Sequence, residues 1–229
     1  MMLVADGLAR SNRCRLRQGS LLAGSVVFFV AVMLAICGAA HGTPPDRPAV
    51  TIYQGQGVDT NLRELLPELV TGNLNYDETY FTGLGYFHPL PTPYVMQRVF
   101  DFLWIPNTRT GLEAIVVKHY GMQHNWEADL AYTFRFAELS ICSLTLRFGV
   151  GFGLSYALST PHYEDGPRDN PDKRYQFQNY DAYEIEWGIA SFPRIGLVSR
   201  IHHRSGVYGL IAPPHVGSNF PPLGLRFSF

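Results

Sequence analysis

Residues 143–156, "SLTLRFGVGFGLSY", alternate without interruption between large apolar side chains and small or charged ones. Successive side chains of a β-strand point to opposite sides, so this pattern predicts one strand with a wholly apolar face. The run is much longer than the usual strand of about five or six residues. A long strand with one apolar and one small or polar face is typical of a membrane β-barrel, in which the apolar face meets lipid.

The same alternation recurs in "NWEADLAYTFRF" (125–136) and in "DAYEIEWGIA" (181–190). Taken together, the second faces carry charged residues of both signs, which suits a narrow barrel filled by ion pairs and hydrogen bonds. This arrangement is the inverse of a soluble barrel. The predicted interior ion-pair partners are Arg200, Arg226, Glu184 and Glu186.

Eight segments are predicted to be strands, an even number that suits closure of a bacterial barrel. They are 50–56, 76–88, 109–121, 124–136, 143–156, 180–192, 194–205 and 219–229. The last one ends on Phe229, which resembles the terminal aromatic signature of bacterial outer-membrane barrels. We therefore expect an all-β fold, an eight-stranded antiparallel transmembrane β-barrel.

Loop lengths predict the orientation of this barrel. Both termini should be periplasmic, with the long connections 157–179 and 206–218 extracellular and a tight joint at 192–194 periplasmic. The charges of the first connection, including Glu164, are expected to be solvated. Two connections are irregular: 60–72 suits a short amphipathic helix, and 91–109 either extends a strand or forms an interfacial element around Trp104.

The N-terminal region predicts a secretory signal peptide over residues 1–40, with cleavage after Ala40 or Gly42, which leaves 41–229 as the barrel. An uncleaved anchor is the alternative, because the apolar run 21–36 is at the short limit for a membrane span. Cleavage leaves Cys142 as the only cysteine, so no intrachain disulfide can form. With 18 basic and 19 acidic residues, the near-zero net charge argues against a nucleic-acid partner.

The candidate chemistry lies in "RIHHRSGVYG" (200–209). Strand parity places His203 and Ser205 on the lipid-facing side at the outer rim, about 6.5 to 7 Å apart at Cα, which lets an imidazole reach a hydroxyl. An active histidine usually has a third group that orients its other ring nitrogen. Parity puts Asn219 on the same face and end, and a tight joint at 192–194 would set Tyr183 and Asp181 opposite His203 and Ser205.

Four segments together resemble a known family: "RIHHRSGVYGL", "GSNFPPLGLRFSF", "NYDETYFTGLGY" and "RFGVGFGLSYA". They are similar to the outer-membrane lipid A 3-O-deacylases, the PagL family of eight-stranded acyl hydrolases. The resemblance implies a bacterial outer-membrane esterase that takes lipopolysaccharide from the outer leaflet and removes an ester-linked acyl chain of lipid A. No metal or organic cofactor is implied.

Carried over to this chain, the resemblance makes His203 the base and Ser205 the nucleophile. Two positions depart from the family pattern. The family's orienting Glu falls on Asn219, so Asp181 is an alternative acid, and the Asn that commonly follows the Ser is Gly206. An amide can orient an imidazole but does not supply charge, whereas the backbone N–H of Gly206 can still serve the oxyanion.

A second hypothesis is a non-catalytic outer-membrane barrel of adhesin or membrane-stability type, with a relic site. His202 and Arg204 are expected to point inward, as interior hydrogen-bonding groups or as contacts to lipid A phosphates. A homodimer is left open. The two hypotheses separate on geometry, because only an esterase requires His203, Ser205 and either Asn219 or Asp181 to cluster outward.

Overall fold

The computed structural model describes residues 47–105 and 107–229. The predicted signal peptide lies outside these described residues and stays a prediction. The elements are β1 (Ala49–Val58), α2 (Leu62–Thr71), β2 (Tyr76–Leu90), α3 (Tyr94–Phe102), β3 (Arg109–Gly121), β4 (Trp126–Arg135), β5 (Leu139–Ile141), β6 (Leu144–Ala157), β7 (Phe177–Ile189), β8 (Ile195–Ser205), the 3-10 turn η2 (Val207–Gly209), β9 (Gly217–Phe220) and β10 (Leu223–Ser228).

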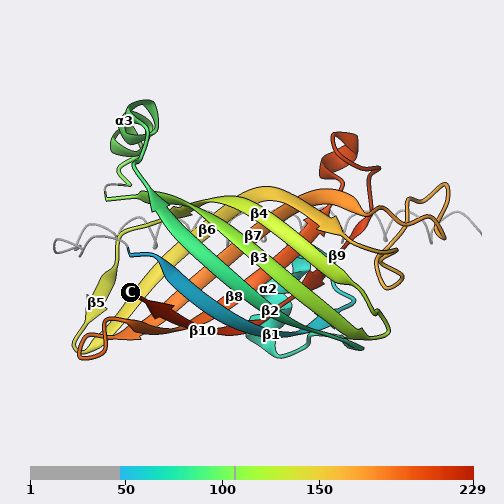
Figure 1. Cartoon of the computed structure of the whole chain (residues 1–229), viewed down its shortest axis with the longest axis horizontal. Coiled ribbons are helices and arrows are strands. Elements are labelled where there is room, and N and C mark those ends of the chain that lie inside the picture. Colours follow the sequence, from blue (N-terminus) through green and yellow to red (C-terminus); the bar gives the residue numbers. More distant parts are fainter. Residues whose placement is uncertain (1–46, 106) are drawn as a thin grey trace, which may run out of the picture. The chain divides into compact units, whose positions relative to one another are not determined.

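The strands close into an eight-stranded antiparallel transmembrane β-barrel, tilted across its axis (Figure 1). Strands that are neighbours in the barrel follow one another along the chain. The short β5 lies off this path and pairs only with β6. The eighth strand comes in two pieces, because Pro221 and Pro222 interrupt β9 and β10 and proline has no N–H for the ladder. β10 pairs with both β1 and β8, which closes the barrel. No helix in the described part of the chain is long and apolar enough to span a membrane.

All eight predicted strands are confirmed, and 109–121 matches β3 end for end. The sixth prediction, 180–192, is displaced, because β7 covers 177–189. Two successive turns occupy 189–195, with Phe192 N–H donating to the Ile189 carbonyl and Ile195 N–H to the Phe192 carbonyl. The expected pairing across this joint is therefore wrong by two residues: Asp181 lies opposite His203, and Asn179 lies opposite Ser205.

The outer wall of the barrel is apolar and uncovered along most of its length. Leu130, Leu154, Leu197 and Leu223 are each 47–57% exposed, although they lie on four different strands. Such a continuous apolar surface matches the lipid-facing band of a membrane barrel. The inward residues of the same strands are buried, as the alternation predicts.

The lumen is layered. We name the end where β1 begins and β10 ends the terminal end, and the opposite end the loop end. Near the terminal end the predicted ion pairs form: Arg200 contacts Glu184 at 2.5 Å, and Arg226 contacts Glu184 at 3.0 Å and Glu186 at 2.7 Å. Glu113 joins this cluster at 2.6 Å from Arg200. The middle is an apolar and aromatic layer of Tyr53, Phe81, Ile115, Val117, Ala131, Tyr180, Ala182, Val198 and Phe220.

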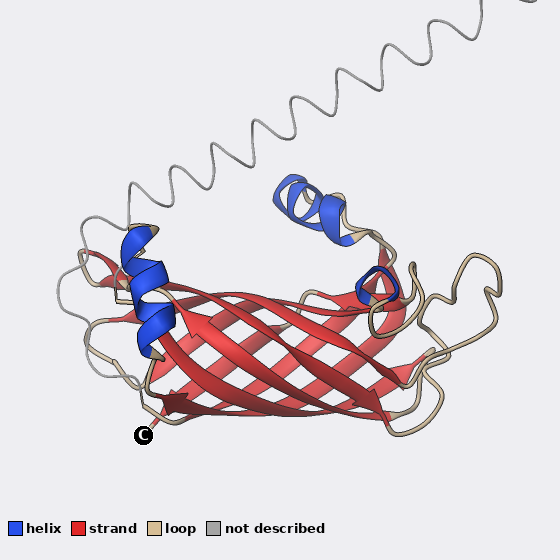
Figure 2. Ribbon diagram, turned by 90° about the horizontal axis from the view of Figure 1, so that it is seen from above, coloured by secondary structure: helices blue, strands red, loops and turns tan. Residues whose placement is uncertain are grey.

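Both irregular connections contain helices, and these lie outside the barrel wall (Figure 2). The amphipathic helix expected at 60–72 is α2. The segment 91–109 forms α3 near the terminal end, where Phe100 packs edge-on against Phe134 of the outer wall with ring centres 5.8 Å apart. Of the two alternatives for 91–109, the interfacial element is the better description.

The long connection between β6 and β7 folds back onto the loop end. Its Glu164 is only 1% exposed and contacts Arg204 and Gln178. The expectation that Glu164 belongs to a solvated face is therefore wrong, because the inward Arg204 needs a carboxylate partner.

Candidate active site

The outward face of β8 carries His203 and Ser205 in its last three residues, near the loop end. Both side chains are half-buried. Their neighbours in the strand, His202 and Arg204, point inward and are at most 2% exposed. The strand periodicity that predicted these faces is thus confirmed. It places the candidate base and nucleophile on the outer wall and leaves the other two residues to the lumen.

β9 presents Asn219 directly opposite His203. The Nδ1 of His203 lies 2.6 Å from Oδ1 of Asn219, and Nδ2 of Asn219 donates to the carbonyl of Thr60 at 2.8 Å. A carbonyl can only accept, so the Thr60 contact turns the amide oxygen toward the histidine. His203 then carries its proton on Nδ1, and Nε2 keeps the lone pair that a general base needs.

Ser205 and Asp181, the next two predicted site residues, flank His203 but form no hydrogen bond with its ring among the described residues. Ser205 is two residues along β8, and among the described residues no hydrogen bond joins its hydroxyl to the His203 ring. Catalytic hydrogen bonds are often long before substrate binds and tighten afterwards. Asp181 sits opposite His203 on β7, but the structure gives the histidine hydrogen bond to Asn219.

Gly206 follows Ser205 and is enclosed by its own loop. Its carbonyl accepts from the N–H groups of Gly209, Ile211 and Ala212 at 3.2–3.3 Å. A Cβ at this position would lie 2.2 Å from the carbonyl oxygens of Ala212 and Pro213. The asparagine of the family pattern therefore cannot be accommodated here without moving the loop. Whether the N–H of Gly206 serves an oxyanion stays a prediction.

The loop after Gly206 is strained. Val207 and Tyr208 both have positive φ, at 49° and 53°, and a β-branched residue such as Val207 rarely adopts this conformation. Residues held in such conformations cost about 1–3 kcal/mol each and concentrate at functional sites. The three hydrogen bonds that the Gly206 carbonyl accepts close this loop tightly, and Val207 and Tyr208 adopt these conformations within it.

Helix α2 borders the site, a feature that the sequence reasoning missed. Leu65 of α2 is fully buried against Val58 and Ile201, and Tyr183 packs on the same cluster. Arg63 Nη2 donates to the Tyr208 hydroxyl at 3.2 Å, which links the helix to the loop that follows Ser205. The amphipathic pattern indicated the helix, but only the folded chain shows that it covers Ile201, two residues before His203 on the same face.

A cavity of about 250 Å³ opens at the terminal end, between Arg147, Glu186 and Ser228, at the other end of β8 from His203. Arg204 and His202 contact Glu127 at 3.3 Å and 2.7 Å. They are interior hydrogen-bonding groups, the first of the two roles expected for them.

The fold and the outward site define a class: a small outer-membrane-type barrel with a histidine–amide pair and a serine on its lipid-facing wall. The crystal structure of the outer membrane enzyme PagL is similar, with a TM-score of 0.51 and 12% sequence identity over 79% of this chain and 99% of that chain. The crystal structure of Neisserial surface protein A is also found, with a TM-score of 0.42 and 10% identity over 80% of this chain and 96% of that one.

The sequence itself matches no family model and no curated protein. At this identity the similarity to PagL shows the fold alone. The expected resemblance is therefore confirmed as a resemblance in fold, and the roles of individual residues rest on the geometry of this chain.

Proposed function

We propose that the protein is a bacterial outer-membrane serine esterase that removes an ester-linked acyl chain from the lipid A part of lipopolysaccharide. The observation that carries the proposal is the hydrogen bond of 2.6 Å between His203 and Asn219 on the outer wall, beside Ser205. A water-soluble substrate would not require a site on this wall. The loop end then faces the cell exterior, in contact with the outer leaflet.

In the proposed reaction, Nε2 of His203 takes the proton of the Ser205 hydroxyl as its oxygen attacks the ester carbonyl. The tetrahedral intermediate places its negative oxygen at the N–H of Gly206. Collapse breaks the ester bond, and the proton on His203 passes to the departing sugar oxygen. Water then hydrolyses the acyl-serine by the same base, which releases the fatty acid and restores Ser205.

Asn219 acts in this reaction by orientation only. It holds the tautomer and the ring position of His203 but adds no negative charge against the imidazolium that forms. Helix α2 is attached to the wall through the buried Leu65 and Ile201, and it exposes Leu66 and Leu69, which offer an apolar surface along which an acyl chain can lie. We therefore propose that α2 helps to position the substrate.

The test is mass spectrometry of lipid A from cells that make the wild type, Ser205→Ala or His203→Gln. We expect loss of one acyl chain with the wild type alone. Ser199→Ala is the matched control, because Ser199 lies on the same outward face of β8, six residues before Ser205. Identical spectra from wild type and Ser205→Ala, with equal amounts of folded barrel, would favour the non-catalytic barrel instead.

A further inference from the structure

A buried group of potential metal ligands lies in the lumen toward the loop end. Glu127 and Asp129 come from β4 and His202 comes from β8, and one ligand atom from each lies within 4.8 Å of the others. The three residues are 0%, 4% and 2% exposed. β6 and β7 separate β4 from β8 in the sheet, so the group bridges two walls of the barrel.

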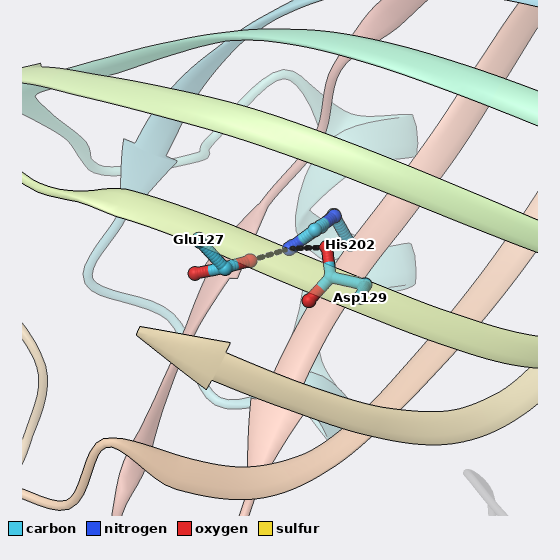
Figure 3. Close-up of side chains that lie close together, drawn as sticks. All are labelled: Glu127, Asp129 and His202. Carbon is cyan, nitrogen blue, oxygen red and sulfur yellow. Dashed lines mark hydrogen bonds and ion pairs between the residues drawn. The ribbon is translucent and has the colours of Figure 1, made fainter. Parts of the chain in front are cut away.

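The carboxylate of Asp129 is the unusual member. Figure 3 shows it facing the His202 ring, and its Oδ2 lies 3.9 Å from Nε2, beyond hydrogen-bonding distance. Neither oxygen of Asp129 accepts a well-aligned hydrogen bond among the described residues, and its nearest polar neighbour on β6 is the hydroxyl of Ser155 opposite it. A buried carboxylate without a partner costs several kcal/mol unless a proton or a cation compensates it. The structure therefore presents two free ligand oxygens at the point where His202 and Glu127 meet.

The charges around this point do not balance. Three carboxylates, those of Glu127, Asp129 and Glu164, surround one guanidinium, that of Arg204. His119 Nε2 also lies 3.1 Å from Glu127, so this carboxylate contacts two imidazole rings. Carboxylates thus outnumber the guanidinium in this part of the lumen, an arrangement that favours the binding of a cation.

We propose that the lumen of this barrel binds one divalent transition-metal ion, best matched by Zn²⁺, through His202 Nε2 and the carboxylates of Glu127 and Asp129. Imidazole together with carboxylates favours Zn²⁺ over Ca²⁺ and Mg²⁺, which prefer ligand sets made of oxygen alone. On binding, Nε2 gives its lone pair to the metal, and the histidine proton resides on Nδ1.

This ion has a structural role that is independent of the proposed esterase. It ties β4 to β8 across the lumen, at the residue next to His203, whose side chain points the other way. Within the described residues, β4 and β8 are already linked across the lumen by the contacts of His202 and Arg204 with Glu127, and the ion would add Asp129 to this link.

The experiment uses the full barrel folded in detergent, stripped with a chelator and then titrated with Zn²⁺ in a calorimeter. We expect one Zn²⁺ per chain for the wild type, and at least a tenfold loss of affinity in Asp129→Asn and in His202→Gln. The matched controls are Asp169→Asn and His124→Gln, which alter exposed residues and should bind as the wild type does.

A second measurement removes the dependence on variants that fold poorly. Co²⁺ added to the stripped wild type should give the visible absorption of a site with nitrogen and oxygen ligands, and excess Zn²⁺ should abolish it. Zn²⁺ should also raise the urea midpoint of the wild type but not that of Asp129→Asn. Absence of stoichiometric binding in the wild type, or equal binding by Asp129→Asn, would overturn the proposal.

Discussion

Asn219 is the residue whose chemistry most affects the site. Its two hydrogen bonds, from His203 Nδ1 and to the Thr60 carbonyl, hold the histidine in the tautomer that a base requires. A carboxylate at this position would accept the same bond and would also stabilise the imidazolium. The neutral amide therefore gives the geometry of a triad without its charge, and for the proposed esterase the expected consequence is a low kcat.

Asn219→Asp should raise kcat for lipid A deacylation by roughly tenfold or more, because the new carboxylate stabilises the protonated His203. It should also lower the free energy of unfolding by about 1–3 kcal/mol, since the Thr60 carbonyl loses its donor. Rates are measured by mass spectrometry in detergent micelles, and stability by urea unfolding. Asn179→Asp is the control, because Asn179 lies opposite Ser205 on the same face but does not contact Nδ1 of His203. An unchanged or lower kcat would argue against Asn219 as the orienting residue.

Helix α2 joins three parts of the site that are distant in sequence. Leu65 packs on Ile201 of β8, Thr60 just before the helix accepts from Asn219, and Arg63 reaches Tyr208. The helix has no other buried side chain, so Leu65 is its main attachment to the barrel. Loss of that contact would loosen the orienting amide together with the loop after Ser205.

Leu65→Glu should detach α2, because a charge in this apolar contact costs at least about 2 kcal/mol. We expect lipid A hydrolysis to fall about tenfold or more, with a smaller effect on a short water-soluble ester that does not need the helix. Val70→Glu makes the same change at a residue of α2 that is 86% exposed, and it should retain activity. Equal losses in both variants would point to a general charge effect rather than docking of the helix.

The β6–β7 connection is expected to respond to pH. Burial raises the pKa of Glu164 to about 7 from its ordinary value of 4.5, although the Arg204 guanidinium opposes the rise. Between these two pH values the folded protein binds more protons at Glu164 than the unfolded chain does. The free energy of unfolding should therefore fall as the pH rises from 4.5 to 7, by at most roughly 3 kcal/mol.

Urea unfolding between pH 4.5 and 8 measures this dependence directly. Glu164→Gln should flatten the profile over that interval, because the amide does not titrate. The exposed Asp169 provides the control, and Asp169→Asn should follow the wild-type profile. Parallel profiles for wild type and Glu164→Gln would contradict the assignment.

The outer wall of the barrel is apolar, whereas its lumen contains polar and charged side chains. Leu130 lies at the middle of β4 and is 54% exposed, whereas its inward neighbours Asp129 and Ala131 are buried. Leu130→Arg should lower the free energy of unfolding in lipid vesicles by about 2–4 kcal/mol, as expected for a cation at the bilayer midplane. Met122→Arg, in the exposed β3–β4 turn, should change it by less than about 1 kcal/mol. Equal effects would mean that Leu130 does not face the hydrocarbon core.

Strand positions and faces could be predicted from the sequence because side-chain parity is a local property. The same parity predicted that Asn219 lies near His203. Contacts across the lumen could not be predicted in this way, since Glu113 and Arg200 are 87 residues apart. The β7–β8 register depended on the length of one turn, and the burial of Glu164 depended on a partner, Arg204, in another element.

The pairing that completes the barrel joins the two ends of the described chain. Ala49 of β1 lies opposite Ser228 of β10, so the ring closes only when β10 has paired with β1. A chain that stops before β9 would leave β1 and β8 as two open edges, each a template for pairing with another molecule. Closure of the ring is therefore also what hides these edges, so a variant that lacks β9 and β10 should aggregate rather than fold as a smaller barrel.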